Sequence, residues 1–156
     1  MLPDQPRLIG SFSLPGCTDH LQSLCNLYQA ILRHIDEDPR RRETLEDLFQ
    51  MNASKVRLRL QKPHMWRLIE LQQIAAHYKL STAIIANAQS SLATLSIWLE
   101  ALPAQDRNLV LRKCHLHHAV FQNRQRIGWG IEHIWELRQG LEESITLMAR
   151  AKKPIS

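Results

Sequence analysis

The last third of the chain carries an apolar pattern that predicts one long amphipathic helix. Apolar residues recur there at spacings of three, four and seven, which keeps them on one helical face for about ten turns. A helix of that length cannot cover its apolar face alone, so it needs partner helices from the same chain or from another protein. The feature therefore predicts an elongated, all-α molecule. The residues are Leu109, Leu116, Val120, Ile127, Ile134, Leu137, Leu141 and Met148.

Three further helices are expected before this one. The first begins near a cap at Thr18 or Asp19 and ends at 36–39, the second runs from about Pro39 to about Leu60, and the third from about His64 to about Leu102. With only 5 glycines and 6% aromatic residues, the composition argues against an all-β fold. We therefore expect an elongated antiparallel bundle of about four helices with long third and fourth helices. The expected boundaries are an extended N-terminal lead at 1–16, a single domain at 17–152 and a tail at 153–156.

The composition also limits the cellular setting. Cys17, Cys25 and Cys114 make an odd number without CxxC spacing, so disulfides are not expected and a reducing compartment is. The N-terminus lacks the pattern of a signal peptide, and no run approaches twenty apolar residues, so neither secretion nor membrane insertion is expected. These features predict a cytoplasmic protein. The net charge of +5 biases encounters toward acidic partners without declaring nucleic-acid binding.

The long final helix predicts a partner-binding surface. Shorter helices cannot cover all of its apolar face, and an uncovered apolar face tends to mark an interaction site. Trp129 and Trp135 are six residues apart and cannot both lie in one narrow seam, so one of them can be an exposed binding residue, although burial in the core remains the simpler interpretation. The expected partner-binding residues are Ile131, Trp135, Leu141, Ile145 and Met148.

Polar residues and glycines interrupt the predicted apolar faces. Asn87 and Asn123 fall on those faces, where a buried polar residue specifies helix register at a cost in stability. Gly128 and Gly130 lie inside the predicted final helix and cost roughly 2 kcal/mol of helix propensity relative to alanine. Close approach of another helix, a kink, or a conformational change on binding would each offset that cost.

Candidate reaction chemistry is sparse. The segment 114–118 holds Cys114, His117 and His118, which a continuous helix would place near one another, but tetrahedral zinc needs three or four ligands and no second cluster has ligand spacing. The alternative is a partly exposed helical face with incidental histidines. There is no P-loop, no GxGxxG and no nucleophile–base pair that spacing alone supports. We therefore expect no metal, no cofactor and no enzymatic activity.

Two stretches together resemble the FlgN family of flagellar export chaperones. The first runs from Ala30-Ile31-Leu32 through the acidic turn at 36–38 to Leu45-Glu46-Asp47-Leu48 and Asn52-Ala53-Ser54-Lys55-Val56. The second is the run at 122–127, where Asn123 and Ile127 match the family pattern and Arg126 replaces its second asparagine. The resemblance implies a small cytoplasmic helical protein that binds C-terminal helices of hook–filament junction proteins before type III export, with a helix lying in an apolar groove.

The leading functional interpretation is thus a non-enzymatic chaperone or adaptor for helical segments of a protein partner. The alternative is a basic bundle that contacts nucleic acid or regulates another protein. That alternative depends on a group of cations that do not all share one helical face. The sequence does not determine the oligomeric state, and a homodimer is one possibility. The cations are Arg40, Arg41, Arg42, Lys55, Arg57, Arg59 and Lys62.

Overall fold

The computed structural model describes residues 12–152, with side chains to residue 150, and this part of the chain is all-helical. The fold class is as predicted, but the prediction of about four helices is wrong, because these residues form eight α-helices and one short 3-10 helix. None of the helices in residues 12–152 is long and apolar enough to cross a bilayer. The elements are α1 (Leu14–Glu37), α2 (Arg41–Phe49), α3 (Ala53–Gln61), η2 (Pro63–Met65), α4 (Leu68–His77), α5 (Ala83–Ala101), α6 (Ala104–Lys113), α7 (His118–Ile127) and α8 (Ile131–Lys152).

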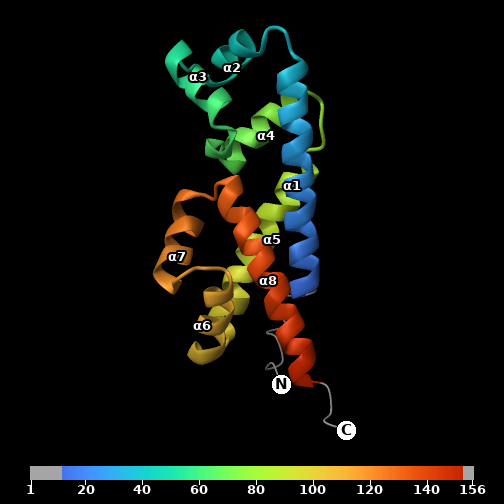
Figure 1. The fold of residues 1–156 in the computed structure, drawn as a ribbon, viewed down its shortest axis with the longest axis vertical. Helices are drawn as coiled ribbons and strands as arrows, with labels where there is room; N and C mark the ends of the chain where they lie inside the picture. The colour runs from blue at the N-terminus through green and yellow to red at the C-terminus, as the bar shows by residue number, and fades with distance from the viewer. Residues whose placement is uncertain (1–11, 153–156) are drawn as a thin grey trace.

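Three long helices form the body of the molecule. Helix α1 packs most extensively against α8 and α5, and both run opposite to it along the long axis (Figure 1). Helices α2 and α3 lie beyond the C-terminal end of α1, and the short helices α6 and α7 lie beside α5 and α8 (Figure 1). The antiparallel arrangement of α1 with its two neighbours buries an apolar face of each of these three helices.

Helix α1 begins earlier than the sequence predicted. Ser13 caps it, because its Oγ accepts a hydrogen bond of 3.0 Å from the Gly16 N–H, and a proline follows in the first turn, where it leaves no donor unsatisfied. Thr18 instead lies inside the helix and donates to the Pro15 carbonyl at 2.8 Å. The predicted extended lead is therefore wrong at Leu14 to Gly16, which are helical, and its first eleven residues lie outside the described residues.

Left-handed residues divide the second and third predicted helices. Gln50 has φ 54° and ends α2, after which the side chain of Asn52 accepts the Lys55 N–H at 2.9 Å and caps α3. Lys79 has φ 60° and separates α4 from α5. Residues other than glycine adopt this conformation uncommonly, so Gln50 and Lys79 do not mark helix ends in the sequence. The spacing of apolar residues continues across both positions and therefore did not predict these breaks.

The predicted final helix is likewise three helices. His115 has φ 57° and lies between α6 and α7, and Gly128, with φ 106° and ψ 152°, lies between α7 and α8. The second conformation is open almost only to glycine. The propensity cost of the glycines is therefore avoided by ending the helix, a sharper break than the kink or close approach that the sequence suggested.

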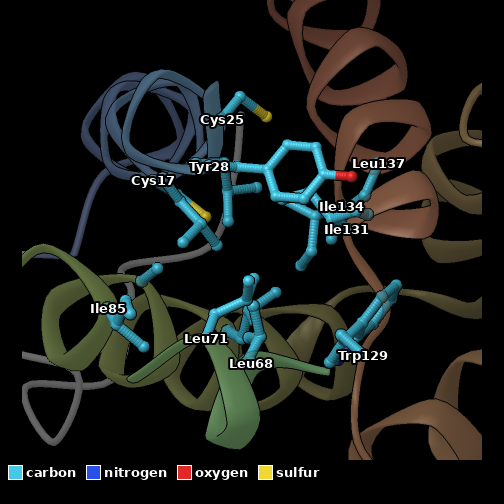
Figure 2. Close-up of a cluster of buried hydrophobic side chains, with 14 of the residues drawn as sticks. Cys17, Cys25, Tyr28, Leu68, Leu71, Ile85, Trp129, Ile131, Ile134 and Leu137 are labelled. Carbon is cyan, nitrogen blue, oxygen red and sulfur yellow. The ribbon is translucent and has the colours of Figure 1, made fainter. Parts of the chain in front are cut away.

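One continuous core joins the long helices. Side chains of α1, α4, α5 and α8 meet in it, and Trp129, from the turn before α8, closes one side (Figure 2). Tyr28 of α1 reaches across toward α8 (Figure 2), and burial raises the pKa of its hydroxyl to about 12. All three cysteines are free and buried in this core, and burial raises the pKa of Cys17 and of Cys114 to about 12.

Asp38 links three helix ends. Its carboxylate accepts hydrogen bonds from the Arg40 N–H at 2.8 Å, from the Tyr78 hydroxyl at 2.8 Å and from the Thr44 hydroxyl at 3.1 Å. The Arg40 N–H, then the Tyr78 hydroxyl, hold the pKa of Asp38 below its ordinary value. The C-terminus of α1, the start of α2 and the C-terminus of α4 are therefore held together by one ionised side chain.

We expect the contribution of Asp38 to stability to be lost in acid. A carboxylate whose pKa is lower in the folded than in the unfolded chain stabilises the fold at neutral pH, and that contribution fades as the pH falls below about 4 toward the folded pKa. Melting temperatures of the wild type and of Asp38→Asn, measured between pH 7 and pH 2, should differ at neutral pH and converge in acid. A difference that grows as the pH falls would contradict this assignment. In Tyr78→Phe, the pKa of Asp38 measured by NMR should rise.

Candidate partner-binding groove

The residues of α8 that were predicted to bind a partner differ in their exposure to solvent. Leu141 is fully buried, so its prediction as a partner contact is wrong, and Ile131 is also buried at 5% exposure. Ile145 and Met148 are partly buried against the core, whereas Trp135 is 44% exposed. The apolar face of α8 is thus largely covered by α1 and α6. Only Trp135 of this set presents a large surface to a partner.

Trp135 stands at a groove between α1 and α8. The Arg138 guanidinium lies 4.4 Å from the centre of its ring and donates a hydrogen bond of 2.7 Å to Glu142, while the rest of the Arg138 side chain is buried. The stack fixes the ring, and an Arg–aromatic contact is favourable where water is excluded. The cavity beside it measures about 400 Å³, and most of its lining surface is apolar although several of its lining residues are polar. It is lined by Gln22, Cys25, Asn26, Tyr28, Gln29, His64, Ile131, Glu132 and Trp135.

The predicted polar residues do not lie in a helix seam. Asn87 and Asn123 are both exposed, and the Asn123 carbonyl oxygen accepts a hydrogen bond of 2.8 Å from Arg126. The prediction that they set helix register is wrong, because the helix breaks change which face of α5 and α7 is buried. On α7 the fully buried residue is Phe121 instead.

A second groove, which is also largely apolar, lies where α4, α5 and α7 meet. It encloses about 420 Å³, and we call it the α4–α5–α7 groove. Ile69 on α4 is 63% exposed and Ile127 on α7 is 48% exposed. Ile97 follows the lining residue Ala93 by four positions on α5 and is 52% exposed, so the apolar surface continues along that helix. The lining residues are Arg67, Leu68, Ile69, Gln89, Leu92, Ala93, Gln125, Arg126, Ile127, Gly128 and Trp129.

A hydrogen-bond network holds the wall of this groove in place. The Trp129 indole N–H donates to the Gln125 side chain at 2.6 Å, and the Gln125 amide donates to the Leu92 carbonyl at 2.8 Å. Phe121 meets the Trp129 ring edge-on at 5.6 Å between centroids. A single antiparallel bridge between Arg67 and Gly130 joins the start of α4 to the turn before α8. The groove is therefore preformed, because α7 is fixed to α5 and to the following turn.

Ile127 was expected on the apolar face of the predicted final helix, but it is exposed, and Ile69 of α4 is exposed as well. In α4 the buried residues are Leu68, Leu71, Ile74 and Ala75, a set spaced for one short helix, and Ile69 falls outside it. Reading α4 as a separate helix would have placed Ile69 on the surface. The helix break at Lys79 defines the end of α4, and the break at Gly128 defines the end of α7. Of these two residues, only the glycine is of a type that indicates a helix break in a sequence.

The Cys114–His118 segment does not gather ligands. Cys114 is buried and its thiol donates to the Leu137 carbonyl, while His118 turns to Glu100 at 2.5 Å. The continuous helix that would have stacked them ends at Cys114. Among the residues with described side chains, no three His, Cys, Asp or Glu side chains are grouped to hold a metal ion.

One member of the predicted basic group is partly buried and paired with a carboxylate, and the others are exposed. Arg59 donates to Glu70 at 2.5 Å and lies over Trp66, so its charge is used to fix α3 against α4. The other cations lie exposed on or near α2 and α3, interspersed on α2 with Glu43 and Asp47. This mixture lowers the local positive potential available to a polyanion.

One serine–histidine contact appears that the sequence did not indicate. His20 Nδ1 lies 2.5 Å from Ser91 Oγ beside a polar cavity of about 210 Å³. Ser91 lies in the middle of α5, where backbone N–H groups are used within the helix and cannot stabilise an oxyanion.

Comparison of the chain with protein-family models, with curated proteins and with solved structures found no match.

Proposed function

We propose that this protein is a non-enzymatic cytoplasmic adaptor or chaperone that binds an amphipathic helix of a partner protein in the α4–α5–α7 groove. The observation that carries the proposal is the joint exposure of Ile69 and Ile127 at the mouth of an apolar cavity of about 420 Å³. Large apolar side chains gathered around a concavity are typical of a binding site, since their exposure to water is unfavourable until a partner covers them.

The shape of the surface favours a helix as the ligand. Three helices border the groove, and Ile97 extends its apolar strip along α5. An amphipathic helix inserts anchors at i, i+3, i+4 and i+7 into such a groove. The resemblance to FlgN chaperones agrees with this mode, so the partner we propose is a helical segment of a protein awaiting flagellar or type III export.

We expect Ile69→Asp to weaken binding of a helical peptide at least about tenfold, because a central apolar anchor of a groove contributes on that scale. The probe is an 18-residue synthetic amphipathic helix with a leucine face and glutamine elsewhere, and the measurement is fluorescence anisotropy with the full chain. Asp at this position, in the first turn of α4, is favourable to the helix dipole, so the fold should be retained.

The matched control is Leu147→Asp, which introduces the same charge at an exposed apolar residue of α8 outside the groove. This control should bind as the wild type does. If no helical probe binds, the proposed function is wrong. If Trp135→Ala rather than Ile69→Asp removes binding, the α1–α8 groove is the site and our choice of groove is wrong.

A further inference from the structure

The charged lining of the α4–α5–α7 groove has one sign. Arg67 and Arg126 line it, and among the described residues that border it no aspartate or glutamate appears. The Arg67 guanidinium reaches the Ile127 carbonyl at 3.5 Å, which places it beside the helix end that carries Arg126. Both arginines therefore lie at the end of the groove where α4 approaches α7.

Neither arginine is neutralised within the described part of the chain. Arg67 donates to a backbone carbonyl and Arg126 donates to the Asn123 side chain at 2.8 Å, and both are uncharged acceptors. Other cations of the molecule do have carboxylate partners, as Arg59 has with Glu70 and Arg138 with Glu142. The guanidinium groups at the groove thus keep their donors and their charge available to a ligand.

We infer that the ligand of this groove is an amphipathic helix whose apolar face is flanked by acidic residues clustered toward one end. The inference rests on the proposed function and adds the charge of the partner. Carboxylates beside the apolar anchors would meet Arg67 and Arg126, whereas a lysine-flanked helix would bring like charges together as water leaves the groove. The groove is concave and can hold a helix. A flat anionic membrane would be contacted better by exposed residues on a convex surface, so we infer a helix as the ligand.

The test uses three synthetic helices with the same leucine face and with glutamate, glutamine or lysine at the flanking positions. Full-length protein should bind the glutamate peptide tightest and the lysine peptide weakest, with at least about a tenfold difference at 20 mM salt that narrows at 300 mM, where charges are screened. In Arg67→Glu/Arg126→Glu this order should reverse. In Arg41→Glu/Arg42→Glu, which changes the net charge equally at two exposed positions of α2, it should persist.

The outcomes separate this inference from the proposed function. Equal binding of the three peptides, still lost in Ile69→Asp, would overturn the acidic partner and leave the helix adaptor standing. Reversal of the order in the α2 control as well would show an effect of net charge alone and would also overturn the inference. Absence of binding by all three peptides would overturn the adaptor itself. Melting curves of both double variants verify that each is folded.

Discussion

Replacing Leu141 by aspartate is expected to unfold most of the protein. Leu141 is fully buried in the core on the face of α8 that the other helices cover. Loss of a buried leucine costs about 2–5 kcal/mol, and an unpaired carboxylate in its place adds several more. The total approaches the whole free energy of unfolding of an ordinary domain, which is about 5–15 kcal/mol. Circular dichroism and urea titration of Leu141→Asp should show a lost or strongly lowered transition.

The control for this prediction lies six residues later on the same helix. Leu147 is 38% exposed, so Leu147→Asp should shift the free energy of unfolding by only about 0.5 kcal/mol. Equal urea midpoints for Leu141→Asp and the wild type would show that α8 is not packed as described. The comparison also shows why Leu141 cannot be used to probe partner binding, since its substitution would remove the fold together with any binding site.

Gly140→Ala is expected to destabilise the protein by about 2 kcal/mol and to lower its melting temperature by about 6 °C. A Cβ atom at Gly140 would lie 2.5 Å from both Cα and Sγ of Cys114 and 2.6 Å from its backbone nitrogen. Alanine improves helix propensity by only about 1 kcal/mol, which is less than the cost of separating α8 from the turn after α6. Thermal and urea denaturation measure the net effect.

A second variant identifies the cause. Because backbone atoms of Cys114 are among the close contacts, Gly140→Ala/Cys114→Ala should remain destabilised relative to Cys114→Ala alone. At Gly130 the nearest atom to an added Cβ is 3.6 Å away, so Gly130→Ala meets no steric clash and should cost about 1 kcal/mol or less through the poorer helix cap. A Gly140→Ala variant as stable as the wild type would mean that the two segments do not approach as closely as described.

Helical periodicity revealed the class of the fold but not the lengths of its helices. The turn at Pro39 was visible because proline and a capping aspartate mark it. The turns at Gln50, Lys79 and His115 were not, because each uses a left-handed residue of a type that also suits a helix interior. The apolar spacing continued across these turns by coincidence, so about four helices with a long third and fourth were expected where residues 12–152 form eight α-helices.

The candidate site was harder to predict than the fold for the same physical reason. The side of a helix on which a residue lies depends on where that helix begins and ends. Because most of the breaks were not predicted, neither the exposure of Ile69 and Ile127 nor the full burial of Leu141 was predicted. The suggestion that one of Trp129 and Trp135 is exposed is confirmed, since Trp129 is buried and Trp135 is half exposed. Gly140 drew no attention in the sequence, although its contact with Cys114 joins α8 to the α6–α7 turn.

The buried thiols of Cys17 and Cys114 can report how often the folded protein opens transiently. Cys17 and Cys114 are almost without contact to water, and burial raises the pKa of each to about 12, so alkylating reagents find neither access nor thiolate in the native state. Their rate of alkylation in native buffer therefore follows the fraction of molecules that transiently open. Mass spectrometry of the two labelled cysteines can thus measure how a bound helix protects the fold, without denaturant and without an added dye.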